Sequence, residues 1–255
     1  MSHPALEKQS HRPWPVPQNA WKGRQTWRDL LFAHWPVPSE KLRRLVPEPL
    51  TIQEHDGASW VGIVPFRMSD AMVRNLPNLP GLSAFPELNL RLYVDYKGKP
   101  GVWFLSLDCT NPLAVWGARR FFHLPYFKAK MNVKNRSGHI HYSSRRKMFS
   151  MQVDFESVYG PVSNPFHAKP GTLEHFLTER YCLYSQSPDG DIYRVEIHHK
   201  PWTLQKAEAS FSTNLTEPFG FQLPETQPLL HFSPIQKVIN WLPEKVKERE
   251  FDIRN

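Results

Sequence analysis

Residues 116–130, WGARRFFHLPYFKAK, combine two adjacent arginines with two lysines at alternate positions among aromatic residues. The planar guanidinium of Arg119 or Arg120 suits a carboxylate or phosphate, which it binds through two parallel hydrogen bonds. Lys128 and Lys130 offer amines, and a lysine amine that is desolvated beside another cation becomes a nucleophile toward carbonyl carbon. The stretch therefore indicates an anion or a carbonyl compound as a ligand.

Two more charged residues stand where chemistry could take place. Glu87 begins a strand after a proline-rich segment, 74–87, which we expect to be a long loop over the surface or a pocket mouth. That position suits a general acid or base, although a strand-end carboxylate in water shows the same pattern. Arg28 lies inside an apolar segment, where an unpaired charge is costly, and Glu87 is the partner that we predict for it. The pair could be catalytic or structural.

Other chemistry finds little support in the sequence. His139 and His141 alternate on a predicted strand, but no third ligand has convincing spacing, so no metal site is predicted. Ser106 and Asp108 share a strand face without a Gly-x-Ser-x-Gly elbow or an ordered triad, which speaks against a serine hydrolase. Neither a glycine-rich phosphate loop nor a dinucleotide fingerprint occurs, and no cofactor is expected.

Short strands separated by turn signals fill most of the chain. The segment 26–37 is apolar and bounded by prolines, and hairpins are predicted at Asp56-Gly57 and around 97–101. Between them, 87–94 alternates between a face of leucines and valine and a face of Glu87, Asn89, Arg91 and Tyr93. Helices are predicted over 39–47, with Ser39 as N-cap; over 111–122, with Asn111 as N-cap and Pro112 at the first position; and from Thr172 into a strand over 172–184. The pattern favours an antiparallel, mainly-β barrel or cone with short flanking helices.

Composition limits the kind of protein. The chain has 255 residues and a formal net charge of +8, with basic residues spread along it and no nucleic-acid recognition motif, so nucleic-acid binding is not expected. Cys109 and Cys182 are far apart and predict buried thiols rather than a disulfide framework. No signal peptide or membrane-spanning stretch is apparent, which places the protein in the cytoplasm without membrane insertion. We expect residues 1–20 to form an arm on one domain spanning 21–255, with Trp14 and Trp21 as its anchors; a homo-oligomer is compatible with this.

Several long segments carry a resemblance to known proteins. LRRLVPEPLTI (42–52), GLSAFPELNLRLYV (81–94) and the helix with Arg119-Arg120 are similar to acetoacetate decarboxylase, segment by segment. Together with RQTWRDLLFAHWPV, VPFRMS, GVWFLSLD and AVWGARRFFHLPY, they resemble more closely the YqjF-like family, a domain of unknown function in the same superfamily. The resemblance implies the acetoacetate decarboxylase-like fold from about residue 20 onward.

The same resemblance implies a pocket. In decarboxylases of this superfamily a lysine forms an imine with a β-keto acid beside a second lysine; here Arg28 matches the pocket arginine, Glu87 a pocket glutamate, and Arg119-Arg120 the lysine pair. Because an arginine stays protonated and is a poor nucleophile, imine chemistry is not expected at that position. The leading interpretation is a pocket for an anionic or carbonyl compound, lined by these four residues. Two alternatives stay open: a lyase or decarboxylase-type enzyme using Lys128 or Lys130 together with Glu87, and a non-catalytic interaction protein with a vestigial pocket.

Overall fold

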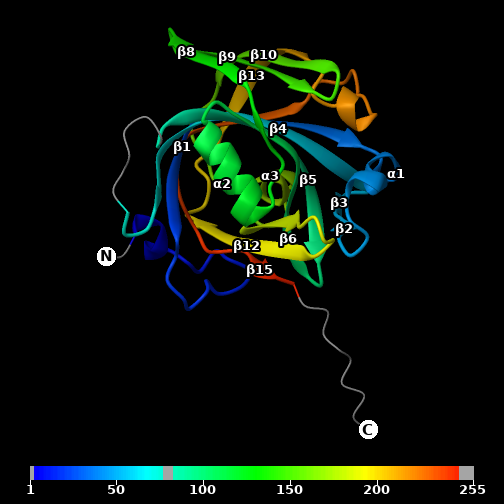
Figure 1. Cartoon of the computed structure of the whole chain (residues 1–255). Coiled ribbons are helices and arrows are strands. Elements are labelled where there is room, and N and C mark those ends of the chain that lie inside the picture. Colours follow the sequence, from blue (N-terminus) through cyan, green and yellow to red (C-terminus); the bar gives the residue numbers. More distant parts are fainter. Residues whose placement is uncertain (1–2, 77–82, 247–255) are drawn as a thin grey trace.

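Strands dominate the architecture of the computed structural model, which describes residues 3–76 and 83–246 (Figure 1). Seven of the described strands close into a ring in the order β14, β1, β4, β5, β6, β11, β12 and back to β14. Neighbours in the ring are antiparallel except for β6 and β11. The ring strands are β1 (Gly23–Val37), β4 (Ala58–Val73), β5 (Phe85–Tyr96), β6 (Lys99–Cys109), β11 (Cys182–Gln186), β12 (Ile192–His199) and β14 (Leu229–Asn240).

A second layer lies against one side of this ring. It is built from β8 (Lys130–Arg136), β9 (His139–Met148), β10 (Met151–Pro161) and β13 (Gln205–Thr213), which form the upper sheet in Figure 1. The short strands β2 (Thr51–Ile52), β3 (Glu54–His55), β7 (Tyr126–Lys128) and β15 (Glu244–Lys245) extend the edges. The mainly-β class predicted from the sequence is therefore confirmed.

Helices are short and lie at the margins of the strands. They are α1 (Ser39–Leu42), α2 (Pro112–Phe122) and α3 (Leu173–Thr178), with 3-10 turns η1 (Pro4–Glu7), η2 (Arg43–Leu45) and η3 (Glu217–Phe219). The predicted caps of the two later helices are confirmed, because the side chain of Asn111 accepts from the amides of Leu113 and Ala114, and that of Thr172 from His175. Ser39 was wrongly predicted as a cap: α1 begins at Ser39 itself and has no side-chain cap.

Two apolar cores follow from the two layers. One fills the space between ring and second sheet and includes Leu88, Leu90, Leu92 and Val94 of β5. The other lies inside the ring, where Phe32, Val64 and Phe66 are buried, and α2 adds Val115 to it from the front of the ring in Figure 1. Both faces of β5 are thus covered, which makes this strand the centre of the molecule.

The N-terminal arm crosses the place where the ring closes. There β12 and β14 are joined over a short stretch, Ile197 to His199 against Val238 to Asn240. The arm bonds to β12 along this stretch: His198 Nε2 lies 2.9 Å from the carbonyl oxygen of Ala5, and Arg12 donates to the carbonyl of Ile197. Trp21 packs with Trp241 in a small core of its own. The anchoring predicted for Trp21 is confirmed, whereas the domain limits, 1–20 and 21–255, stay a prediction.

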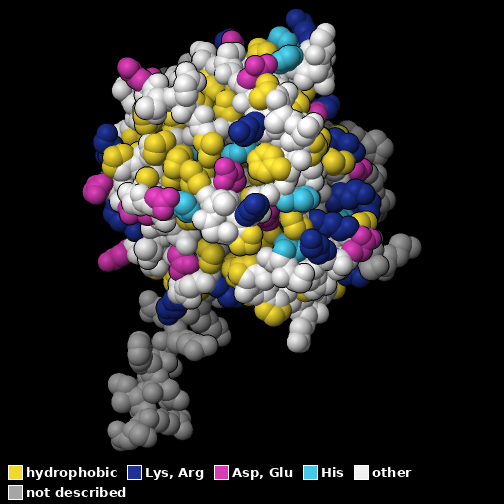
Figure 2. Space-filling view, turned by 180° about the vertical axis from the view of Figure 1, so that it is seen from behind, with side chains coloured by type: hydrophobic (Ala, Val, Ile, Leu, Met, Phe, Trp, Pro, Cys, Tyr) yellow, Lys and Arg dark blue, Asp and Glu magenta, His cyan; other side chains and the backbone are white. Residues whose placement is uncertain are grey.

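Charge is distributed over the surface. On the rear face, Figure 2 shows Lys and Arg side chains interspersed with acidic and apolar ones rather than joined in one continuous basic strip. Within the described residues, no helix is long and apolar enough to cross a membrane.

Candidate functional site

The inner face of β5 carries a row of polar side chains. Glu87, Asn89, Arg91 and Tyr93 alternate with the leucines, as predicted, and all four are buried. Antiparallel pairing sets Glu87 between Phe66 of β4 and Cys109 of β6, so these side chains share the interior of the ring. Buried polar groups are costly unless they are hydrogen-bonded, which makes this row the first place to look for function.

Glu87 meets Tyr126 at one end of the row. The Tyr126 hydroxyl donates to Glu87 Oε2 at 2.7 Å, and Glu87 is only 3% exposed. The chain brings Tyr126 there because α2 ends at His123 in a left-handed conformation and β7 then runs parallel to β6, with Tyr126 beside Leu107. From the second sheet, the Tyr142 hydroxyl donates to the backbone carbonyl of Glu87 at 2.7 Å. Contacts from both layers therefore hold this residue in place.

Burial sets the protonation of this pair. It raises the pKa of Glu87 to about 7, and the hydrogen bond from Tyr126 opposes the rise. Burial and the nearby Glu87 together raise the pKa of Tyr126 well above its usual value. The same causes raise the pKa of the Cys109 thiol to about 12. Near neutral pH, Glu87 exists in both protonation states while its two neighbours keep their protons.

Arg28 does not join this site. It is exposed, and its Nε donates to Ser69 Oγ at 3.0 Å, so the predicted pair with Glu87 is wrong. The cause is an irregularity at Asp29, which has φ 52°, and one extra residue of β1 relative to β4 between Arg28 and Ala33. The strand changes sides there, so Trp27 packs into the interior core in place of Arg28.

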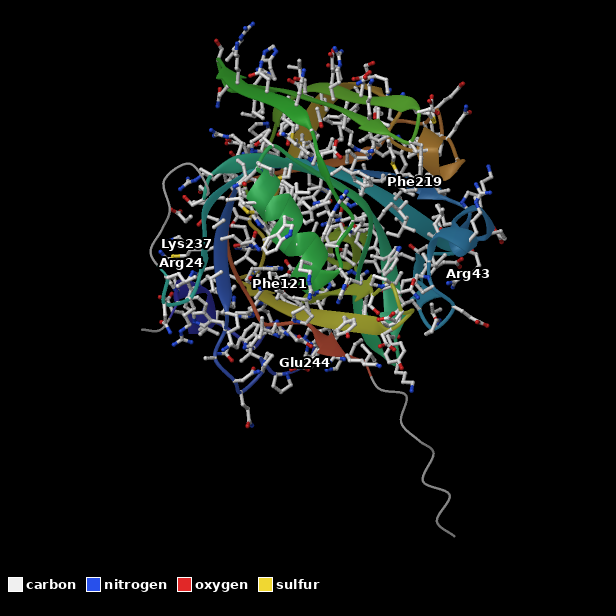
Figure 3. The ribbon with its side chains drawn as sticks, in the orientation of Figure 1. Arg24, Arg43, Phe121, Phe219, Lys237 and Glu244 are labelled. Carbon is white, nitrogen blue, oxygen red and sulfur yellow. The ribbon has the colours of Figure 1, made fainter. Side chains whose placement is uncertain are left out.

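The two arginines of α2 lie on its outer side. Arg119 and Arg120 are both exposed, whereas Val115 is the buried residue of the helix. Arg119 donates from Nε to the backbone carbonyl of Tyr126 at 2.5 Å, and Arg120 lies over the ring of Phe121, which Figure 3 labels. Neither guanidinium therefore contacts Glu87, but Arg119 holds the backbone of the residue that does.

The two lysines are exposed as well. Lys128 ends β7 and Lys130 begins β8, with the buried Ala129 between them. The two side chains do share a side, as the alternation predicted, but that side is the solvent. The alternative of a lysine-dependent enzyme places Lys128 or Lys130 in the mouth of the ring, and no contact in the described residues supports that placement.

A second polar cluster inside the ring was missed by the sequence reasoning. Further along β5, Arg91 and Tyr93 meet His34 of β1 and Arg180, which follows α3. The sequence contained a signal for Arg91, because this residue was predicted on the polar face of a strand whose other face is apolar. It contained no signal for Arg180, since only the fold brings that residue next to β5.

Surface hollows lie elsewhere. One is lined by residues of 40–44 and 217–222, and another by side chains of β8, β9, β10 and β13; none of the predicted site residues lines either hollow. Among the described residues, no group of three His, Cys, Asp or Glu side chains is placed to hold a metal ion.

The ring of strands, with the second sheet packed against it, defines a class of fold. Over 96% of both chains, the structure is similar to acetoacetate decarboxylase from Legionella pneumophila, with a TM-score of 0.60 and 15% identity. Over 88% of both chains, it is similar to the enduracididine biosynthesis enzyme MppR, with a TM-score of 0.64 and 12% identity. The fold is that of the acetoacetate decarboxylase-like proteins.

Sequence similarity narrows this class to one family. The family model DUF2071, described as an uncharacterised conserved protein, matches residues 24–237, and the chain belongs to this family. It is also 48% identical over 227 residues to the uncharacterised protein YqjF of Bacillus subtilis (strain 168), which covers 89% of this chain and 93% of YqjF. The resemblance stated from the sequence is thereby confirmed.

Proposed function

We propose that the interior of the ring binds a small carbonyl compound at Glu87 and Tyr126, and that Glu87 transfers a proton to and from it. The observation that carries the proposal is the buried hydrogen bond between these two side chains, 2.7 Å long. A carboxyl group with a pKa of about 7 is a donor in half of the molecules and an acceptor in the other half at neutral pH. Such a group suits reversible proton transfer.

The chemistry follows from one base and one hydroxyl donor. The Tyr126 hydroxyl, turned from Glu87 to the ligand, donates to the carbonyl oxygen and so makes the C–H bonds of the neighbouring carbon more acidic. Ionised Glu87 is the base that takes a proton from that neighbouring carbon. The C–H electron pair then forms the C=C bond of an enolate, the carbonyl π pair moves to the oxygen that Tyr126 contacts, and the proton stays on Glu87. Return of the proton restores the ketone, so no oxidant, reductant or imine is required.

The solved relatives support the class of ligand. Structures of MppR hold pyruvate and a condensation product of pyruvate with imidazole 4-carboxaldehyde. Pyruvate carries a carbonyl group next to a carboxylate. A compound of this kind matches the anionic or carbonyl ligand expected from the sequence.

The polar atoms buried inside the ring argue against the alternative of a non-catalytic protein with a vestigial pocket. Buried polar atoms without hydrogen-bond partners destabilise the folded protein, and apolar groups in their place would make a protein without a ligand more stable. Yet the ring holds such atoms in Asn89 (Oδ1), His34 (Nδ1) and Ser233 (Oγ), none of which has a hydrogen-bond partner among the residues that the structure describes. Their retention favours a ligand that completes these contacts.

The test is exchange of α-protons. Pyruvate and acetoacetate are incubated with the protein in D2O, and loss of the proton signal next to the carbonyl is followed by NMR. We expect acceleration over buffer that falls about 100-fold or more in Glu87→Gln, the range typical of a lost acid or base. Glu225→Gln, at an exposed position, is the matched control and should keep the rate. Rates equal to buffer for the wild type, together with no saturable binding in calorimetry, would refute the proposal.

A further inference from the structure

Two buried arginines meet inside the ring at the other end of the polar row. Arg91 is 9% exposed and Arg180 is 5% exposed. Both guanidinium groups lie over the ring of Tyr93, with their central carbons 5.4 and 5.0 Å from its centre. Arg91 also lies over Phe32, and Arg180 over Phe176. Two positive charges are thus held next to one aromatic side chain.

Neither arginine forms an ion pair with a carboxylate of the described residues. Arg91 donates to the Tyr93 hydroxyl at 3.1 Å and to the carbonyl of Leu177 at 3.3 Å. Arg180 donates to the carbonyl of Phe176 at 2.7 Å and to the side-chain oxygen of Gln53. Within 3–76 and 83–246, no carboxylate forms an ion pair with either of them. All of their hydrogen-bond partners in this part of the chain are neutral, and the charge of Asp95 on β5 acts on Arg180 only from beyond ion-pair distance.

Donors remain unused in this cluster. Arg180 Nη2 and His34 Nδ1 are both buried, and neither has a hydrogen-bond partner among the described residues. The Tyr93 oxygen accepts from Arg91 and lies 2.5 Å from His34 Nε2. In the tautomer in which Nε2 accepts the Tyr93 proton, His34 carries its own proton on Nδ1, and this nitrogen is a donor too. Both unsatisfied atoms of the cluster, Arg180 Nη2 and His34 Nδ1, are then hydrogen-bond donors, and a ligand that satisfies them must supply an acceptor.

The backbone opposite makes room for Arg91. Gly62 of β4 faces it, and a Cβ there would lie 3.1 Å from Cγ and 3.2 Å from Nε of Arg91, and 3.2 Å from Cδ2 of His34. A side chain at position 62 would therefore push the guanidinium or the imidazole aside. The absence of one lets both groups share this part of the interior.

The positive charges of the two buried arginines favour binding of an anion between them. An uncompensated buried cation is strongly unfavourable, and two adjacent ones more so, unless an anion neutralises them. Burial and the neighbouring Arg91 lower the pKa of Arg180 to about 10, so it still carries its charge at neutral pH. Guanidinium groups bind carboxylates through paired hydrogen bonds. An oxyanion between the arginines would satisfy both the charge and the unused donors.

We propose that Arg91 and Arg180, with His34, form a buried site for the carboxylate of a small organic acid. The anion site itself is independent of the chemistry at Glu87; only its role as the carboxylate subsite of a carbonyl compound rests on the proposed function. Glu87 and Arg91 are four residues apart on one strand face, about 13 Å at about 3.3 Å per residue. Because Arg91 donates to Tyr93 and Leu177, a ligand that contacts both Glu87 and the arginines must be longer than pyruvate or acetoacetate.

The test uses acetate, which has a carboxylate but no ketone. Calorimetric titration of the full chain should show acetate binding that weakens at least tenfold in Arg180→Gln. Gly62→Ala is the second variant, because it keeps both arginines and only displaces Arg91, and it should weaken binding similarly. Circular dichroism shows whether each variant is folded. Glu225→Gln, at an exposed position, is the control and should bind acetate as the wild type does.

The possible outcomes separate the two proposals. No acetate binding to the wild type, or binding that survives both Arg180→Gln and Gly62→Ala, overturns the anion site while the exchange reaction at Glu87 can still stand. Binding of inorganic phosphate but not acetate overturns the assignment to a carboxylate. Acetate binding that depends on Arg180, in a protein that leaves α-protons untouched, supports the anion site and refutes the proposed function alone.

Discussion

Glu87→Gln should stabilise the folded protein in alkaline solution and leave it almost unchanged in acid. Below pH 4.5, the usual pKa of a glutamate, the carboxyl of Glu87 is protonated in both the folded and the unfolded protein. Its ionisation therefore does not affect the free energy of unfolding there. Between pH 4.5 and 7 the unfolded chain releases the proton while the folded one, with a pKa of about 7, keeps it. The free energy of unfolding therefore falls through this window and is constant above it.

The magnitude follows from the two pKa values. Each pH unit between 4.5 and about 7 corresponds to about 1.4 kcal/mol, which gives about 3 kcal/mol in all. Glutamine never ionises and can still accept the hydrogen bond from Tyr126. At pH 8 we therefore expect Glu87→Gln to be about 3 kcal/mol more stable than the wild type, and at pH 4 to be equal to it.

Urea unfolding followed by tryptophan fluorescence, repeated from pH 4 to pH 8.5, measures this difference. Glu225→Gln replaces an exposed carboxylate and should show little dependence on pH. A difference between wild type and Glu87→Gln that does not change with pH, or a less stable variant at pH 8, would refute the reasoning. The expected result means that the protein carries an ionisable group at a cost to stability, as functional sites often do.

Three further changes test other contacts. Tyr126→Phe removes the hydrogen bond that lowers the pKa of Glu87, so a carbon-13 NMR titration should place that pKa above 7; an unchanged value would contradict the donor role of Tyr126. Asp108→Asn removes the charge opposite Arg146, whose side chain is 0% exposed, and should cost about 3–5 kcal/mol in urea unfolding; a loss below about 1 kcal/mol would mean that the pair is not needed. Arg12→Ala should speed amide hydrogen exchange within residues 3–21 while leaving β5 protected, and equal rates would show that other contacts hold the arm.

The sequence predicts best where local rules act alone. Alternation along 87–94 correctly separated the leucine face from the polar face, because a strand side chain has only two directions to choose from. The caps at Asn111 and Thr172 were also correct, since a cap depends on residues within one turn. These two kinds of rule were enough to select Glu87 as a candidate.

The errors arose where the chain departs from regular geometry. Leu30 and Phe32 face the interior, so regular alternation would direct Arg28 inward as well. The left-handed conformation of Asp29 instead reverses which side of the strand the residues before it face, and the apolar sequence contains no signal for this irregularity. On α2 the large aromatic residues Trp116 and Phe121 are 61% and 56% exposed, while the smaller Val115 is buried. Close packing against the ring favours small side chains, and only the fold shows which side that is. The proline-rich loop predicted over 74–87 includes 77–82, which lie outside the described residues, and β5 already begins at Phe85.

The arm across the junction of β12 and β14 has a practical consequence for how this protein is produced. Similarity to the family covers residues 24–237, whereas Ala5, Trp21 and Trp241 form their core outside those limits. A chain cut at the family boundary would lose Val238 to Asn240, and with them all the described backbone pairs between β12 and β14, so the ring would no longer close at this junction. The cooperative unit is therefore longer than the segment that the family model matches, and an expressed chain should include the arm and extend past Trp241.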